Sequence, residues 1–202
     1  MNSKLVKLKR QSYDIGLFGK KSTGKTLILS FLGYLKYKQG ATIYSNYPLN
    51  IPHKYINTLQ DLNEIYKENP NKVKIFLGDD FERCFNSRNT RGQINKELND
   101  ILLDWGKINC SLYYTAKRSM AIDIGLRDST SEFWFPELKQ GYKSENPNIN
   151  KQLKDYLNFL YINITRFDEN LDTLPSIRVF RLQNIVPIFD TQTIITPIRA
   201  KR

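Results

Sequence analysis

The segment Gly19–Thr26 restricts the fold of this chain more than any other feature of its sequence. It reads Gly-Lys-Lys-Ser-Thr-Gly-Lys-Thr, so two glycines enclose a short polar stretch, and a Lys and a Thr follow. Glycines at these positions let the backbone wrap around a phosphate group with its N–H groups pointing inward. The apolar stretch Ile15–Phe18 precedes the segment and an amphipathic helical pattern follows it, as this motif requires. We therefore expect a phosphate-binding loop (P-loop) that binds ATP together with Mg²⁺.

Each part of the loop has an expected role. A side chain at Gly19 or Gly24 would obstruct the wrap around the phosphates. Lys25 is expected to reach the β and γ phosphates as a point charge, and the hydroxyl of Thr26 to bind Mg²⁺. The predicted nucleotide-binding residues are Gly19, Lys20, Lys21, Ser22, Thr23, Gly24, Lys25, Thr26 and Leu27.

A predicted strand that ends in two acids is the expected partner of this loop. The mostly apolar segment Val73–Leu77 is followed by Gly78, Asp79 and Asp80. Asp79 is predicted to hold Mg²⁺ together with Thr26, and Asp80 stands where many ATPases carry a Glu that polarises the attacking water. The alternative is that these acids form only a polar turn after a strand.

Apolar segments alternate with helical patterns, which is typical of a mostly parallel α/β sheet flanked by helices. The predicted strands of this sheet are Ser12–Phe18, Ala41–Ser45, Val73–Leu77, Cys110–Thr115 and Glu132–Phe135. Helices are predicted at Thr26–Tyr37 and Leu59–Glu68, and a further helical stripe comprises Ile94, Leu98, Ile101, Leu102 and Trp105.

The pattern changes in the last third of the chain. Gln140–Leu153 is polar and is predicted to be an exposed loop. Tyr156–Arg166 and Pro175–Leu182 are predicted to pair as a C-terminal antiparallel β-ribbon across a turn at Asp168–Asp172. We expect one domain over residues 1–202, with a nucleotide-binding core at 12–136 and the polar loop, ribbon and tail at 137–202.

The charge of the chain suggests a polyanionic partner. The sequence has 31 Lys and Arg against 20 Asp and Glu, a formal net charge of +11. A domain this basic is typical of proteins that bind nucleic acid, or less often a membrane surface. The alternative is that the charge serves only solubility.

Several classes of protein are not expected. Cys84 and Cys110 are the only cysteines and His53 is the only histidine, so neither a disulfide framework nor a zinc site is predicted. Met1–Gln11 is basic but lacks the apolar stretch of a signal peptide. The longest apolar region, Leu27–Leu35, is too short to span a bilayer. We expect an intracellular, soluble protein with no transmembrane segment of its own.

The residues that follow the P-loop form a recognisable order. After the acidic pair Asp79-Asp80 come Ser87-Arg88, Trp105-Gly106-Lys107, Thr115-Ala116-Lys117 and Asp123–Arg127. This order resembles the FtsK–HerA superfamily of ring-forming, DNA-pumping ATPases. It resembles more closely their viral genome-packaging branch, found in tailless icosahedral viruses with an internal membrane, including viruses of hot-spring archaea.

Two further segments resemble related proteins. Ile43–Leu49 resembles the Zot-like assembly ATPases of filamentous phages, a sister group, and Phe189-Asp190-Thr191 is similar to a late Asp-Thr element in several of these proteins. The resemblance implies a P-loop NTPase fold of the RecA/FtsK-like kind and a homo-oligomeric ring, a pentamer or a hexamer. It also implies double-stranded DNA and a viral capsid or internal membrane protein as partners, in the host cytoplasm or in association with the virion.

The resemblance also implies roles for individual residues. Thr115 and Lys117 fall at the sensor positions, but the family carries a Gln where this chain has Lys117, and Lys can only donate hydrogen bonds. Arg127 matches an arginine finger that reaches the active site of a neighbouring subunit. The rival arginines are Arg88, Arg91 and Arg118, and the alternative for Arg127 is a surface ion pair with Asp123 or Asp128. The predicted catalytic residues are therefore Lys25, Asp79, Asp80, Thr115, Lys117 and Arg127.

Basic residues are expected to grip the DNA backbone without reading bases. The candidates are Lys139, Lys143, Lys151 and Lys154, with the basic tails at Lys4–Arg10 and Arg199–Arg202. The predicted function is ATP-driven translocation of double-stranded DNA, packaging a viral genome into a capsid. The alternatives are a Zot-like virion assembly or secretion ATPase, and a nucleotide-gated DNA-binding module with slow turnover. A small-molecule kinase is disfavoured because no arginine-rich lid is visible.

Overall fold

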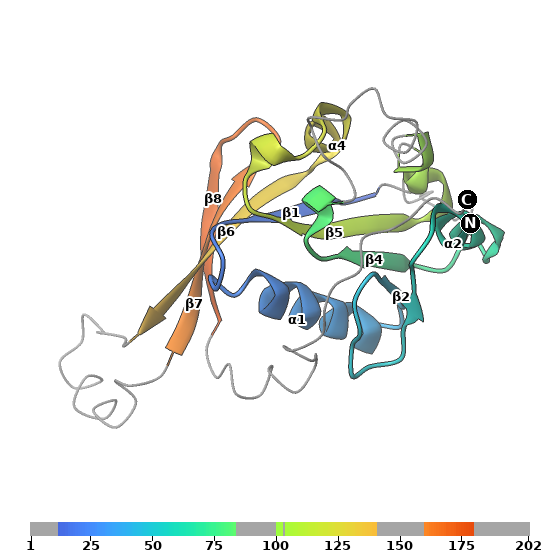
Figure 1. Ribbon diagram of the computed structural model, residues 1–202, viewed down its shortest axis with the longest axis horizontal. Coiled ribbons are helices and arrows are strands. Elements are labelled where there is room, and N and C mark those ends of the chain that lie inside the picture. Colours follow the sequence, from blue (N-terminus) through green and yellow to red (C-terminus); the bar gives the residue numbers. More distant parts are fainter. Residues whose placement is uncertain (1–11, 84–99, 103, 141–159, 180–202) are drawn as a thin grey trace, which may run out of the picture.

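An eight-stranded sheet organises the part of the chain that the computed structural model describes, residues 12–83, 100–102, 104–140 and 160–179 (Figure 1). The strand order is β3-β2-β4-β5-β1-β6-β7-β8. All pairings from β3 to β6 are parallel, and β7 and β8 add to β6 in antiparallel fashion. The strands are β1 (Ile15–Phe18), β2 (Thr42–Ser45), β3 (Lys54–Tyr55), β4 (Lys74–Gly78), β5 (Cys110–Ala116), β6 (Glu132–Gln140), β7 (Leu160–Asp168) and β8 (Thr173–Val179).

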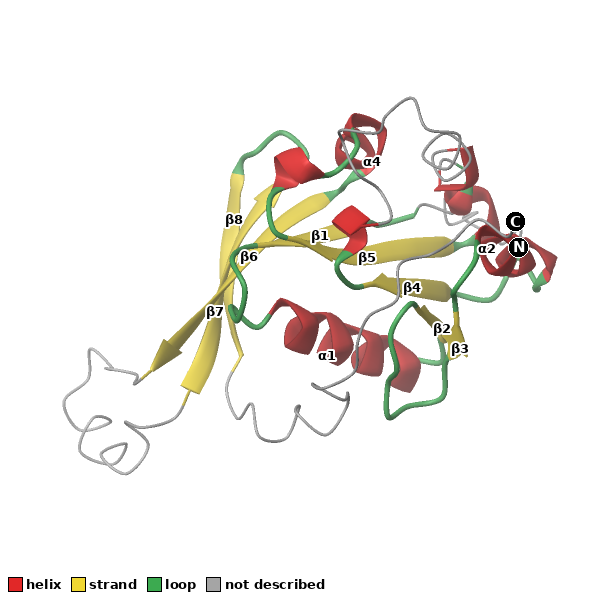
Figure 2. Cartoon of the chain, in the orientation of Figure 1, coloured by secondary structure: helices red, strands yellow, loops and turns green. Residues whose placement is uncertain are grey.

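Helices cover both faces of this sheet. They are α1 (Lys25–Lys38), α2 (Leu59–Lys67), α4 (Ile124–Ser129) and the 3₁₀ helices η1 (Phe81–Arg83), η3 (Trp105–Ile108) and η4 (Ser119–Ala121). Figure 2 shows α1 on one side of the sheet and α4 on the other. On the α1 side, Ile28 and Leu29 pack with Leu77 in one buried cluster. On the opposite side, Trp105 and Leu126 belong to a second buried cluster.

The central strands are apolar on both faces because both faces are covered. Every residue of β1 and of β4 is buried, including Lys74, whose ammonium donates to the carbonyl oxygens of Asn69, Lys72 and Ile108. Continuous apolar runs of this kind are typical of parallel strands between two helical layers. The predicted fold class, a P-loop α/β fold with a mostly parallel sheet, is confirmed.

The predicted helical stripe ends differently from the expectation. Residues 100–102 are helical, but the chain around the buried Trp105 forms the 3₁₀ helix η3. Asn109 then adopts a left-handed conformation with φ 56°, and β5 begins at the next residue. The described chain thus turns at Asn109 directly before it enters the sheet. Ile94 and Leu98 lie outside the described residues.

The C-terminal ribbon is a continuation of the main sheet. The predicted strand Glu132–Phe135 is too short, because β6 runs through Pro136 to Gln140. A proline is tolerated there because β1 ends at Phe18, so Pro136 interrupts no ladder to β1. The turn at Asp168–Asp172 is confirmed, and the Asp168 carboxylate accepts hydrogen bonds from the backbone N–H groups of Asn170 and Asp172.

The bounds of the ribbon strands also differ slightly from the predicted ones. β7 is described from Leu160 and β8 to Val179, so the predicted ends at Tyr156 and Leu182 lie outside the described residues. β6 crosses the expected boundary between residues 136 and 137. The division of residues 1–202 into one domain with these two parts stays a prediction. In the described part of the chain, no helix is both long and apolar enough to cross a bilayer.

The register of the parallel strands brings three segments to one end of the sheet, called the phosphate end below. Phe18 lies beside Ala116, and Gly78 lies beside Tyr114. Gly19, Asp79 and Lys117, which follow these strands, therefore line the same end. At the opposite end, β6 begins at Glu132 beside Ile15 of β1.

Candidate functional site

The P-loop connects β1 to α1 at the phosphate end. Gly24 has φ 88° and directly precedes the first residue of α1, a left-handed conformation that side chains rarely adopt. A Cβ atom at Gly24 would also lie 2.4 Å from Cδ1 of Ile162, a fully buried residue of β7. Glycine is thus required at this position both by the backbone and by packing against the C-terminal ribbon.

The side chain of Lys25 lies over the loop itself. Its Nζ donates to the carbonyl oxygens of Gly19 and Lys20, each at 2.8 Å, and the hydroxyl of Thr23 donates to the same Lys20 oxygen at 3.1 Å. Partial burial lowers the pKa of the Lys25 ammonium, and the charge of Asp79 opposes this shift. A bound phosphate would replace these neutral carbonyl oxygens with anionic oxygens as the acceptors of the Lys25 ammonium.

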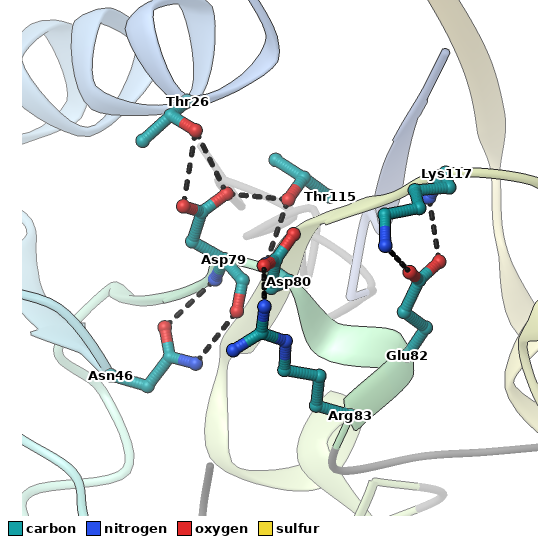
Figure 3. A network of polar contacts seen from close by, with 8 residues as sticks. All are labelled: Thr26, Asn46, Asp79, Asp80, Glu82, Arg83, Thr115 and Lys117. Atoms are coloured by element: carbon teal, nitrogen blue, oxygen red, sulfur yellow. Dashed lines mark hydrogen bonds and ion pairs between the residues drawn. The ribbon is translucent and has the colours of Figure 1, made fainter. Parts of the chain in front are cut away.

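Asp79 follows β4 and is 3% exposed. The hydroxyl of Thr26 donates to its two carboxylate oxygens at 3.1 and 3.0 Å, and the hydroxyl of Thr115 donates to Oδ1 (Figure 3). Burial raises the pKa of the Asp79 carboxyl, and the hydrogen bonds from Thr115 and Thr26 partly offset that effect.

The oxygens of this pair fit a magnesium ion. Mg²⁺ prefers hard oxygen ligands and is usually held by only one or two protein groups with water and phosphate completing its shell. The hydroxyl of Thr26 and the carboxylate of Asp79 are within hydrogen-bond distance of each other, beside the P-loop, and so present such ligands at one point.

Asn46, which the sequence analysis did not single out, fixes the backbone of Asp79. Its side-chain Nδ2 donates to the Asp79 carbonyl at 2.9 Å, and the Asp79 N–H donates to its Oδ1 at 2.8 Å. Asn46 is fully buried at the end of β2. A buried polar residue directly after an apolar strand was the available signal, but its partner depends on β2 lying next to β4.

Thr115 and Asp80 are also brought together. The Thr115 hydroxyl, which donates to Asp79, accepts a hydrogen bond of 2.9 Å from the Asp80 N–H. Asp80 has φ 46°, and its carboxylate lies 3.2 Å from the guanidinium of Arg83 in η1. The acidic pair is therefore divided, with Asp79 facing Thr26 and Asp80 facing Arg83 (Figure 3).

Lys117 pairs with a second residue that the sequence analysis missed, Glu82. The Lys117 N–H donates to Oε2 of Glu82 at 2.7 Å, and Nζ of Lys117 lies 3.5 Å from Oε1. Glu82 belongs to η1, which follows the acidic pair, so the ends of β4 and β5 are joined through this contact. A Glu two residues after Asp80 gave no recognisable signal, because a motif search expects the second acid directly after the first.

Arg127 lies away from this network, in α4. Its Nη1 donates to the sulfur of Met120 at 3.1 Å. A cavity of about 280 Å³ is lined by Arg127 and Phe135, and by Glu169 and Leu171 from the β7–β8 turn. That turn begins at Asp168, which pairs with Glu132 at the opposite end of the sheet. This placement is compatible with action on another subunit, and the finger role stays a prediction.

The remaining predicted site residues divide between described and undescribed segments. Lys20, Lys21 and Ser22 are exposed on the P-loop, and Leu27 packs against the core on the α1 side. Lys139, near the end of β6, forms an ion pair of 2.7 Å with Glu137. Arg118 is exposed after β5. The candidates outside the described residues are Ser87, Arg88, Arg91, Lys143, Lys151, Lys154, Phe189, Asp190, Thr191 and both basic tails.

The fold and this site together define the fold of P-loop NTPases: a parallel sheet, a phosphate loop between its first strand and first helix, and a buried acid facing the Thr of that loop. No family model matches the sequence, and no curated protein matches it.

Solved structures give the particular likeness. The chain is similar to the N-terminal domain of zonular occludens toxin (Zot) from Neisseria meningitidis, with a TM-score of 0.59, 14% identity, and coverage of 89% of this chain and 100% of that one. It is also similar to the genome-packaging NTPase B204 of Sulfolobus turreted icosahedral virus 2. The complex with AMP gives a TM-score of 0.50 and 12% identity over 83% of this chain and 98% of that one. The complex with AMPPCP gives a TM-score of 0.50 and 10% identity over 84% of this chain and 97% of that one. The predicted resemblance to packaging ATPases and to their Zot-like sister group is confirmed at the level of the fold.

Proposed function

We propose that this protein binds ATP at the P-loop, hydrolyses it with Mg²⁺, and uses the energy to move double-stranded DNA into a viral capsid. The observation that carries the hydrolytic part is the contact between Thr26 and Asp79, which joins the P-loop to the end of β4. The packaging part is supported by the fold that the chain shares with B204, a genome-packaging NTPase solved with AMPPCP and with AMP.

Nucleotide binding is expected at the P-loop. The predicted loop residues, Gly19 to Leu27, supply backbone N–H groups to the phosphates, and Lys25 exchanges the carbonyls of Gly19 and Lys20 for phosphate oxygens. Thr26 and Asp79 would hold Mg²⁺, which when bound neutralises charge on the phosphates.

Hydrolysis needs a positioned water and stabilisation of charge on the transferring phosphoryl group. Thr115 orients the end of β4 through its bonds to Asp79 and to the Asp80 N–H. The carboxylates of Asp80 and Glu82 are the groups available near the ends of β4 and β5 to polarise water. Arg127 would complete the site of a neighbouring subunit in a pentameric or hexameric ring. The cavity that Arg127 lines includes residues of the β7–β8 turn, and this turn begins at the end of the sheet opposite the P-loop.

DNA binding is supported by charge. A net charge of +11 favours a polyanionic partner, and the exposed side chain of Lys139 lies on the part of β6 that extends beyond its pairing with β1. Lys143, Lys151 and Lys154 belong to the same proposal. We expect the protein to act in the host cytoplasm or on the virion, with a capsid or internal membrane protein as its docking partner.

A second candidate function is a virion assembly or secretion ATPase. The observation that favours it is the similarity to the Zot N-terminal domain, whose whole length is covered. In that case duplex DNA would leave the hydrolysis rate unchanged. A third, a nucleotide-gated module, would bind ATP tightly and fail to hydrolyse it even in a single turnover.

The test is the ATPase rate of the wild type and of Arg127→Ala at increasing protein concentration, with and without duplex DNA. A ring translocase gives a rate per subunit that rises with protein concentration and with DNA, and Arg127→Ala lowers it by about 10³-fold or more. Mixing Arg127→Ala with an inactive Lys25→Ala protein should restore part of the rate. The Arg127→Ala subunit supplies an intact P-loop, and the Lys25→Ala subunit supplies the arginine. A DNA-independent rate that is the same at all protein concentrations would contradict the proposal.

A further inference from the structure

The pair formed by Glu82 and Lys117 has a geometry that the predicted roles of Asp80 and Lys117 do not explain. Two different contacts hold the Glu82 carboxylate. The backbone N–H of Lys117 fixes Oε2 at 2.7 Å, whereas the ammonium of Lys117 lies 3.5 Å from Oε1. The first contact does not depend on the lysine side chain. The second is longer and involves a side chain that is 61% exposed, so it can open while the carboxylate stays in place.

This pair also lies at the phosphate end of the sheet. Lys117 directly follows Ala116, which lies beside Phe18, and Phe18 leads into the P-loop. The hydroxyl of Thr115, two residues before Lys117, donates to Asp79. The pair is therefore at the end of the sheet where the Lys of a P-loop reaches the β and γ phosphates.

Asp80 is less suited than Glu82 to receive a proton from water. Its carboxylate lies 3.2 Å from the Arg83 guanidinium, and its side chain is 27% exposed. The carboxylate of Asp80 is thus already engaged by a guanidinium from the turn that follows it. The side chain of Glu82 is only 14% exposed, and the ammonium of Lys117 lies farther from it, at 3.5 Å, than the guanidinium of Arg83 lies from Asp80.

We propose that Glu82 is the catalytic carboxylate that accepts the proton of the attacking water, and that Lys117 is a latch that masks Glu82 until the γ phosphate arrives. This inference rests on the proposed ATP hydrolysis and assigns a role and a form of regulation within the same site. It gives Lys117 a function that a Gln at this position could not perform, since only a cation can be drawn from a carboxylate to a phosphate.

The hydrolytic step balances with these residues. The oxygen of water forms a bond to the γ phosphorus while the bond from that phosphorus to the β–γ bridging oxygen breaks, leaving ADP. One proton of the water passes to Glu82 and from there to solvent, and the products are ADP and inorganic phosphate. Lys117 does not exchange protons. It moves from Oε1 of Glu82 to a γ-phosphate oxygen on binding, and returns when phosphate leaves.

The first test compares Glu82→Gln with Asp80→Asn in single-turnover hydrolysis, with the protein in excess over radiolabelled ATP. Glu82→Gln should slow hydrolysis by about 10²–10⁴-fold, the range of general base catalysis, while the affinity for ATP stays near that of the wild type. Asp80→Asn should slow hydrolysis less than Glu82→Gln does. The opposite ranking overturns the inference.

The second test addresses the latch through the preference for ATP over ADP. Lys117→Met should weaken ATP binding about tenfold or more and leave ADP binding unchanged, because only ATP carries the phosphate that the ammonium would contact. Lys117→Arg should restore the preference in part. Lys67→Met is the matched control, since Lys67 forms an exposed ion pair with Glu64 on α2 and should change neither affinity. Equal weakening of both nucleotides by Lys117→Met would mean that the lysine is only structural, and would overturn the latch.

The outcomes separate this inference from the proposed function. If the wild type shows no single-turnover hydrolysis, the proposed ATPase itself fails. If the wild type hydrolyses ATP and Glu82→Gln does so equally well, only the role of Glu82 fails.

Should Glu82→Gln lower the melting temperature markedly, Glu82→Asp provides the second variant. It keeps the charge on a shorter side chain, and should fold, bind ATP and hydrolyse it at an intermediate rate. A Glu82→Asp protein with the full wild-type rate would count against direct contact with the water.

Discussion

Two buried carboxylates at opposite ends of the sheet have different kinds of hydrogen-bond donors. Glu132, 4% exposed at the start of β6, accepts hydrogen bonds from the Arg166 guanidinium, the Trp134 Nε1 and the Tyr13 hydroxyl. Asp79, 3% exposed at the phosphate end, accepts side-chain hydrogen bonds from the hydroxyls of Thr26 and Thr115. Within the described residues no Lys or Arg forms an ion pair with Asp79.

The difference appears in the proton affinity of the two groups. Burial raises the pKa of Glu132, but the hydrogen bonds from Tyr13 and Arg166 outweigh it and hold the pKa below its usual value. The pKa of Asp79 stays raised, because burial dominates its hydroxyl partners. A buried charge without a cation is costly. Glu132 therefore has its cation within the fold, whereas the partners of the Asp79 carboxylate are neutral hydroxyls, as the proposed Mg²⁺ site requires.

The largest expected effect comes from removing the charge of Asp79. Asp79→Asn should lower the ATPase rate by about 10³-fold or more, because charge stabilisation by a bound metal amounts to several kcal/mol. The free energy of unfolding should stay the same or rise, since an uncompensated buried charge is lost. Steady-state ATPase assays and urea unfolding measure the two quantities. A large loss of stability would show that Asp79 is as structural as Glu132.

The next effect in size is the loss of the Arg166 side chain. Arg166→Met leaves the carboxylate of Glu132 without its cation and should lower the free energy of unfolding by about 3–5 kcal/mol. The variant should still hydrolyse ATP at the normal rate per folded molecule at low temperature. Combining it with Glu132→Gln should recover much of the stability in urea unfolding. A double variant as unstable as Arg166→Met would show that packing, and not charge, explains the cost.

A pH-dependent effect concerns Asp14, which is buried beside the opposite end of β1 and accepts a hydrogen bond of 2.8 Å from the Leu112 N–H. Burial raises the pKa of this carboxyl from 3.8 to about 7. A raised pKa in the folded state stabilises the fold at low pH, and this contribution is lost as the pH rises from about 4 to about 7. Asp14→Asn should therefore remove part of the pH dependence of unfolding in this interval. Identical slopes for wild type and variant would contradict the shift.

The sequence predicted those parts of the site in which local spacing determines the geometry. The P-loop and the acids after β4 belong to this group, because a strand and the turn that follows it are contiguous. Asn46 could not be paired with Asp79 from the sequence, since they lie 33 positions apart and meet only through the adjacency of β2 and β4. Glu82 and Lys117, 35 positions apart, depend likewise on β4 lying beside β5. The length of β6 was underestimated because Pro136 suggests an end to a strand, and only the end of β1 at Phe18 explains why it is tolerated.

The packing of Ile162 beneath Gly24 has a consequence for the order in which this protein matures during synthesis. The P-loop leaves the ribosome early, but the residue that supports its second glycine is part of β7 and is made much later. A nascent chain that ends before β7 carries the complete phosphate motif on an unsupported loop. The P-loop can therefore reach the packing that it has in the fold only after β7 has been synthesised.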